Sequence, residues 1–185
     1  MLRAFTISAL GSITYYVGIT YVPAFLASVG SFTERQALWL STLAAVAVIA
    51  VTPVVGLLSD RFGRKPVLLS LAVLSLVLPI LMFSLMAGTS TSRALLGAVI
   101  MALVAGGVSA VGAVATAEQF RGEARVSGLA LGATIATAIF GGLTPYLAQV
   151  MIDEFQRPEI PGVMIAVVAL CVLPVFLRMR ETRPR

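Results

Sequence analysis

The sequence predicts an all-α membrane protein built from six transmembrane helices. Of its 185 residues, 59% are hydrophobic and 11% are charged, and the mean hydropathy is +1.02. A soluble domain carries about 25% charged residues, so this composition excludes an ordinary soluble, disordered or disulfide-stabilised fold. The apolar residues form long continuous runs rich in Leu, Ala and Val, whereas strands of a transmembrane β-barrel would alternate between apolar and polar residues.

Six of these runs are long enough to cross a bilayer, whose hydrocarbon core of about 30 Å requires about 20 helical residues. None contains Asp, Glu, Lys or Arg, and together they make one domain over residues 1–185. The expected helices cover residues 5–29, 37–59, 66–87, 94–117, 127–151 and 162–177. The first run is too long for the core of a signal peptide, which has about 7–15 apolar residues.

The charges between the runs predict an orientation. With six spans, both termini, the second-to-third loop and the fourth-to-fifth loop lie on one side. That side carries ten cations, namely Arg3, Arg61, Arg64, Lys65, Arg121, Arg125, Arg178, Arg180, Arg183 and Arg185, and the other side has Arg35, Arg93 and Arg157. The positive-inside rule therefore predicts a multi-pass protein of the cell membrane with both termini in the cytoplasm.

The residue types present exclude several functions. The chain has no histidine and one cysteine, Cys171. This excludes Ser–His, Cys–His and His–metal catalysis, as well as an intramolecular disulfide. The basic residues lie in short loops, whereas a nucleic-acid-binding protein presents them on a solvated face. We therefore expect no enzyme, no cofactor, no metal site and no nucleic-acid partner.

The densest group of charges lies between the second and third runs, in the sequence Gly56-Leu-Leu-Ser-Asp60-Arg61-Phe62-Gly63-Arg64-Lys65-Pro66. A new helix is expected at or just after Pro66, since proline suits the first turn. Gly63 can adopt a left-handed turn, and Gly56 lets a neighbouring backbone approach. Asp60 can pair with Arg64 or lie at the N-terminus of an adjacent helix. Alternatively, these cations serve only as an anchor at the membrane surface.

The spacing G-x-x-x-D-R-x-G-R-K resembles the loop signature of the major facilitator superfamily of secondary transporters, which follows the second helix of each six-helix half. Two further charge pairs are similar to that superfamily, Glu118 with Arg125 and Glu181 with Arg183. The resemblance implies that residues 56–65 form a cytoplasmic gating motif. The charge pairs would join it in a salt-bridge network that favours one of two states. The alternative is solvated surface charge of little energetic value.

A longer stretch, residues 117–145, is similar to the second half of the metabolite:proton symporter branch. It contains Ala138-Ile-Phe140-Gly141-Gly142-Leu-Thr144-Pro145. Two departures are Arg121-Gly122, where the branch has Pro-Thr, and Ala133-Thr134, where it often has Tyr-Asn. The resemblance implies the C-terminal six-helix half of a major facilitator fold, with two three-helix units of opposite topology. Members of the branch move small carboxylates or zwitterions with protons, and the second departure leaves the solute open.

Hydroxyl groups mark the expected solute cavity. In the first run, Ser8, Ser12, Tyr16 and Thr20 recur every four residues and so share one helix face. The resemblance implies that the first and fourth helices line the cavity, the second and fifth form the seam with the other half, and the third and sixth face lipid. The candidate lining residues are Ser12, Tyr16, Thr20, Ser109 and Thr134. Hydrogen bonds between helices are the alternative role for each hydroxyl.

These features predict half of a 12-helix, proton-coupled transporter that works by alternating access. Because no run contains an ionisable residue, the carboxylate that couples proton movement would lie in the other half. The expected partners are the lipid bilayer, a small solute, protons, and a complementary six-helix half or a second copy of this chain. The alternatives are an inactive truncated fragment and a membrane scaffold or accessory subunit without transport activity.

Overall fold

The computed structural model describes residues 2–118, 124–179 and 181, with the backbone alone for residues 2 and 124–129. Within these ranges every regular element is a helix, which confirms the predicted fold class. The elements are α1 (Leu2–Tyr15), η1 (Tyr16–Thr20), α2 (Val22–Ser28), α3 (Glu34–Phe62), α4 (Arg64–Met86), α5 (Thr91–Glu118), α6 (Ala124–Thr137), η2 (Ala138–Gly142), α7 (Thr144–Phe155) and α8 (Ile160–Leu177). Five helices are long and apolar enough to cross a membrane, and the bent pair 3–28 makes a sixth span.

Two helix starts depend on specific side chains. α3 begins at Glu34 because Thr33 forms a capping box with Gln36, in which each side chain accepts a hydrogen bond from the backbone of the other. α4 begins at Arg64 and not at or after Pro66, which was the expectation from sequence. The reason is Gly63, whose positive φ of 103° ends α3 and lets the next helix start immediately.

The first and fifth spans are each broken by a π-helical turn. η1 leads through Tyr21 into α2, with a bend of 44°, and η2 leads through Leu143 into α7. A π-turn pairs the carbonyl of residue i with the amide of residue i+5, and Pro145 cannot supply this amide to Phe140. The Thr144 hydroxyl donates to the Phe140 carbonyl instead, at 2.8 Å. The sequence Thr144-Pro145 thus tolerates the break because a side chain satisfies the freed carbonyl.

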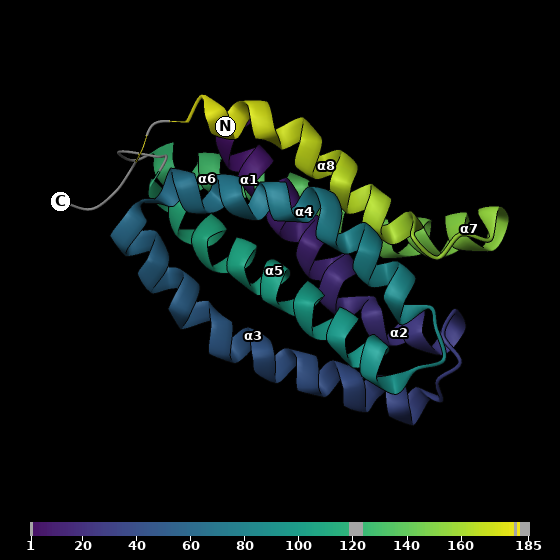
Figure 1. The fold of residues 1–185 in the computed structure, drawn as a ribbon. Coiled ribbons are helices and arrows are strands. Elements are labelled where there is room, and N and C mark those ends of the chain that lie inside the picture. Colours follow the sequence, from purple (N-terminus) through teal and green to yellow (C-terminus); the bar gives the residue numbers. More distant parts are fainter. Residues whose placement is uncertain (1, 119–123, 180, 182–185) are drawn as a thin grey trace.

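α5 is the central helix of the bundle (Figure 1), and it packs against α1, α3 and α4. Its small residues permit this contact. A Cβ at Gly106 would lie 3.0 Å from Val48 on α3, and one at Gly107 would lie 3.0 Å from Leu71 on α4. α4 packs along α8 on the other side. In Figure 1 the start of α1 and the end of α8 lie at one end of the bundle, and α2 and α7 lie at the opposite end.

Large apolar side chains are exposed on most of the spans, and two parts of the bundle are the least buried. On α3 these include Leu38, Trp39, Ile49 and Leu57, and on η2 and α7 they follow residues 139–155. In the membrane-crossing window of α3, 17% of the residues are buried, compared with 61% in that of α5. α3 and the η2–α7 segment are therefore the elements with the least cover from the rest of the chain.

Candidate functional site

Four helix ends meet around Arg64, at the end of the bundle where α1 begins and α8 ends. The Arg64 side chain is 7% exposed and forms ion pairs with Asp60 on α3 and Glu118 on α5. Its guanidinium also donates to the Ser59 hydroxyl at 2.6 Å. A buried guanidinium is tolerated only where its charge and its N–H groups find partners, and this one joins the ends of α3 and α5 to the start of α4.

Glu181 caps the start of α4. Its carboxylate accepts hydrogen bonds from the backbone amides of Arg64 at 2.8 Å and Lys65 at 3.2 Å. These amides belong to the first helical turn, where N–H groups lack an intrahelical partner and the helix dipole favours negative charge. A Cβ at Gly63 would lie 2.6 Å from the carboxylate carbon of Glu181. The positive φ therefore requires glycine here, and a Cβ would also displace the Glu181 carboxylate from its position at the start of α4.

Lys65 makes the complementary contact with α8. Its ammonium group donates to the carbonyl of Leu177, the last residue of that helix, at 2.7 Å. A cation is favourable at a helix C-terminus for the same dipole reason. Arg64, Lys65 and Glu181 thus tie the ends of α3, α4, α5 and α8 into one charge cluster.

The remaining residues of the predicted motif and network lie elsewhere. Arg61 is exposed and lies 5.7 Å above the ring centre of Phe62. No described atom comes within 4 Å of a Cβ built on Gly56, so the neighbouring backbone expected there does not come from the described part of this chain. The Arg125 side chain and all of Arg183 lie outside the described residues.

A cavity of about 520 Å³ lies between α1, η1, α5 and α6. Among the described side chains, its wall contains seven hydroxyl-bearing residues and no charged one, namely Ser8, Ser12, Tyr15, Tyr16, Ser109, Thr116 and Thr137. Ser12 and Thr137 share a hydrogen bond of 2.9 Å, which joins the first span to the fifth. Tyr15 is 44% exposed, so the cavity is open on one side.

The structure brings three of the five candidate lining residues, Ser12, Tyr16 and Ser109, onto this wall. Thr20 and Thr134 are exposed and lie off it. Thr137 was not among the lining residues predicted from the sequence, and it lies three residues beyond Thr134 on the face that meets Ser12. The sequence contains an indirect indication of Thr137. The hydroxyl groups on one face of the first span need polar residues on a neighbouring helix as hydrogen-bond partners.

A smaller polar group links the same two spans at the opposite end of the bundle. Tyr21 donates to the side-chain oxygen of Gln149 at 2.6 Å, and Ser28 donates to the same oxygen at 3.3 Å. Gln149 in turn donates to Asp153 at 3.0 Å. These contacts fix α2 to α7 beyond the two π-turns. The predicted site residues did not include this group.

This arrangement can bind a polar solute without forming charge pairs. Hydroxyl groups donate and accept hydrogen bonds, so the cavity wall suits a carboxylate, an amine or a neutral polar group. The charge cluster can hold helix ends together in one conformation and hydrate in another, because its members lie at the membrane edge.

Comparison with known proteins identifies the family of this chain. The Major Facilitator Superfamily profile matches residues 4–185. The proline/betaine transporter of Escherichia coli is 31% identical over 174 residues, which are 94% of this chain and 35% of that protein. The citrate-proton symporter of Klebsiella pneumoniae is 28% identical over 166 residues, which are 89% of this chain and 37% of that protein. The chain thus spans about a third of the length of these relatives.

The fold also has a counterpart of known structure. A crystal structure of a double tryptophan mutant of XylE superposes on 98% of this chain with a TM-score of 0.72. The match covers 44% of the XylE chain at 16% sequence identity. At this identity the similarity shows the fold alone, and it corresponds to somewhat less than half of the larger protein.

Proposed function

Because the chain belongs to the Major Facilitator Superfamily, we propose that it forms one half of a secondary transporter. The transported solute would be a small organic carboxylate or zwitterion, carried together with protons by alternating access. The single observation that carries this proposal is the open cavity whose described wall residues include seven with hydroxyl groups and none with a charge. Three of the relatives support the solute class, since their names specify proline and betaine, citrate with a proton, and alpha-ketoglutarate.

The proposal assigns one wall of the solute site to this chain. Ser12, Tyr16, Ser109 and Thr137 would hydrogen-bond the solute, and a second six-helix body would supply the opposite wall. Proton coupling in a membrane needs an ionisable group within the spans. The six apolar runs contain no Asp, Glu, Lys or Arg, so the coupling carboxylate would belong to that second body.

The charge cluster would act as the cytoplasmic latch of the transporter, with both termini in the cytoplasm. Asp60, Arg64, Glu118 and Glu181 would hold the helix ends together when the inner side is closed. Hydration of these groups would compensate for the broken pairs when that side opens, since they lie at the membrane edge. A two-state device of this kind needs a difference of only a few kcal/mol.

The second body would pack on α3 and α7, whose large apolar side chains are exposed. Between helices in lipid, close van der Waals packing replaces the hydrophobic effect as the driving force. The open positions at Gly56 on α3 and Gly142 in η2 would let a partner backbone approach. This body would be a complementary six-helix half or a second copy of the chain.

The test is uptake by proteoliposomes that contain the chain alone or the chain co-expressed with an N-terminal half from the same branch. A proton gradient should drive uptake of labelled betaine, citrate or α-ketoglutarate only by the pair. Ser12→Ala should reduce this uptake by about tenfold, the effect of roughly 1.4 kcal/mol. Ser84→Ala is the matched control, because Ser84 is exposed on α4 and bonds only its own helix.

The other outcomes separate the alternatives. Failure to form a complex with any half or with itself would identify an inactive fragment. A stable complex that takes up no solute would identify a scaffold or accessory subunit. Uptake by the strictly monomeric chain would contradict the half-transporter proposal.

A further inference from the structure

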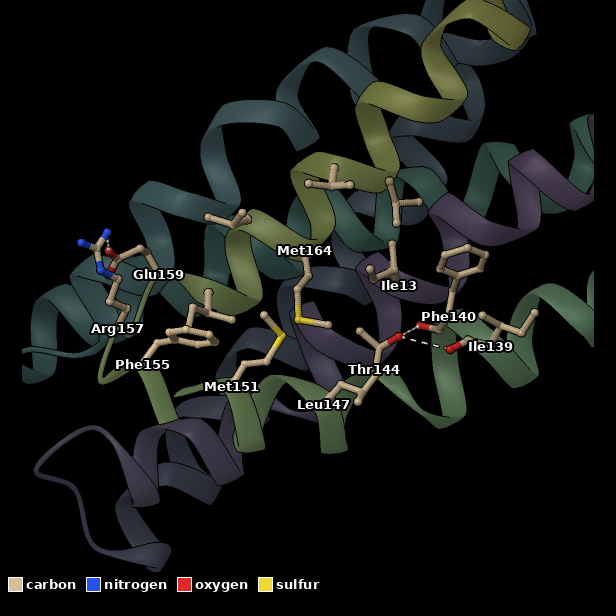
Figure 2. A pocket seen from close by; sticks show the side chains of 14 residues that line it. Ile13, Ile139, Phe140, Thr144, Leu147, Met151, Phe155, Arg157, Glu159 and Met164 are labelled. Atoms are coloured by element: carbon tan, nitrogen blue, oxygen red, sulfur yellow. Dashed lines mark hydrogen bonds and ion pairs between the residues drawn. The ribbon is translucent and has the colours of Figure 1, made fainter. Parts of the chain in front are cut away.

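A second large cavity lies between α7 and α8, at the end of the bundle remote from the charge cluster. It is an apolar groove of about 560 Å³. Leu147, Met151 and Phe155 line it from α7, and Val163, Met164 and Val167 line it from α8. Figure 2 shows Met151 and Met164 pointing toward one another across it, with Phe155 at one end and Ile13 and Phe140 at the other.

The groove has the length of one bilayer leaflet. It begins at the α7–α8 turn, whose residues 153–159 are mostly polar and mark the membrane surface. Its lining runs along α7 and η2 from Phe155 back to Ile139. The 12 residues of α7 alone make about 18 Å of helix at 1.5 Å per residue, and η2 extends the groove further. Half of a bilayer with its headgroup region is about 20–22 Å thick. The groove therefore extends from the surface to the middle of the membrane.

The wall excludes water and polar solutes as occupants. Apart from Arg157 and Glu159 at the surface, Thr144 is the one residue with a polar side chain among the described residues that line the groove. Its hydroxyl already donates to the carbonyls of Ile139 and Phe140. An apolar occupant leaves no hydrogen-bonding group of its own unsatisfied here. The two methionines can adjust to a flexible chain because the thioether side chain is unbranched and polarisable.

The surface end of the groove carries a cation. The Arg157 side chain is 73% exposed, and its partner Glu159 lies 3.8 Å away. Figure 2 places both residues beside Phe155 at the same end of the groove. A guanidinium at the headgroup level has free N–H donors for a phosphate, which it can bind through two parallel hydrogen bonds.

The groove is distinct from the face that a second six-helix body would cover. Leu147 and Met151 line the groove, whereas their neighbours Tyr146 and Val150 are exposed outside it. Successive helical residues differ by about 100° around the axis. α7 therefore has two apolar faces, one toward the seam and one toward α8 and the lipid.

From these observations we infer that the α7–α8 groove is a phospholipid-binding site. One acyl chain lies between Met151 and Met164 with its end near Ile13, and the phosphate lies beside Arg157. The inference requires a bilayer around the chain but no transport activity, so it stands or fails independently of the proposed function.

The test is native mass spectrometry of the full chain, extracted in mild detergent from vesicles of phosphatidylethanolamine and phosphatidylglycerol. The wild-type chain should retain one phospholipid. Val167→Trp fills the groove and should reduce retention by about tenfold, since the acyl chain loses its apolar contacts. Val77→Trp on α4 is the matched control, because Val77 is 56% exposed, Val167 is 54% exposed, and only Val167 lines the groove. The control should retain lipid as the wild type does.

A surface variant tests the headgroup contact without changing the packing. Arg157→Gln should reduce retention by about fivefold, and Arg93→Gln, an exposed cation at the same end of the bundle, should not. If Val167→Trp does not fold, the comparison of Arg157→Gln with Arg93→Gln still tests the inference. Equal retention by both tryptophan variants, or by both glutamine variants, would overturn the inference. So would the absence of lipid from the wild type, or cross-linking that places a partner helix in the groove.

Discussion

Gly63 meets two requirements that other residues do not meet together. Its φ is 103° and a Cβ there would lie 2.6 Å from the Glu181 carboxylate. Gly63→Ala should therefore lower the free energy of unfolding by about 2 kcal/mol or more, from backbone strain and the loss of a helix cap. Thermal unfolding of the purified protein in detergent measures this effect.

Gly56→Ala is the control for this prediction, because a Cβ at Gly56 meets no described atom within 4 Å and α3 is helical there. Its unfolding midpoint should equal or slightly exceed that of the wild type. Equal destabilisation by the two variants would show that Gly63 has no special role in the helix junction.

Asp60 should matter more for transport than for folding. Its side chain is 56% exposed, so Asp60→Asn should cost about 1 kcal/mol of stability or less. In the assembled transporter the same change should reduce uptake about tenfold, because that corresponds to a shift of roughly 1.4 kcal/mol between two conformations. Uptake assays with a parallel measurement of membrane abundance test this. Glu154→Gln is the control, because it removes one negative charge at the opposite end of the bundle. Equal loss of uptake and abundance would assign Asp60 to folding alone.

At the residue scale, the sequence indicated which charges would gather but not every contact. The pairing of Asp60 with Arg64 follows from their i, i+4 spacing on adjoining helix ends. The carboxylate of Glu181 bonds amides 116 and 117 residues earlier in the chain. No local pattern encodes such a contact, because backbone amides are present at every residue except proline.

The break in the fifth span depends on one hydroxyl. Thr144→Val should destabilise the protein by about 1–2 kcal/mol, since the carbonyls of Ile139 and Phe140 then lose this hydroxyl donor inside the membrane. Thr42→Val is the matched control, because Thr42 also donates to the carbonyl four residues earlier, which keeps its helical amide partner. Thermal unfolding of both variants gives the comparison, and equal effects would show that the π-turn does not require the Thr144 hydroxyl.

The π-turns also explain where a helical pattern stops being informative. Ser8, Ser12 and Tyr16 recur every four residues and line the cavity, but Thr20 does not. Between Tyr16 and Thr20 the helix pairs residue i with i+5, as in the bond from the Tyr21 amide to the Tyr16 carbonyl. The wider turn rotates all later residues away from the stripe. A 3.6-residue period cannot predict this change, because it assumes one helix type throughout.

For the whole molecule, the charge distribution predicts which side of the membrane each end occupies. In a Cys171→Ala background, a cysteine added after Arg185 should resist a membrane-impermeant thiol reagent applied to intact cells. A cysteine at Ser90, in the turn between α4 and α5, should react under the same conditions. The positive-inside rule gives this expectation, and equal labelling at the two positions would contradict it.

The class of fold follows from composition, since apolar runs of this length have few alternatives to membrane helices. Composition does not identify the partner that covers the exposed faces of α3 and α7. Any apolar surface that packs closely against these faces would be suitable. The sequence thus predicts the helices and one cluster of their ends, and it leaves open the surface on which the second body packs.

The contact between Glu181 and the start of α4 also constrains the order of events during synthesis. Arg64 leaves the ribosome 117 residues before Glu181. At roughly 5–20 residues per second, the first amides of α4 wait about 6–23 s for their carboxylate. During that interval the junction of α3 and α4 has only its local partners Ser59 and Asp60, and later Glu118. The charge cluster is therefore complete only after Glu181 has been synthesised, so that a residue made much later fastens the junction of α3 and α4.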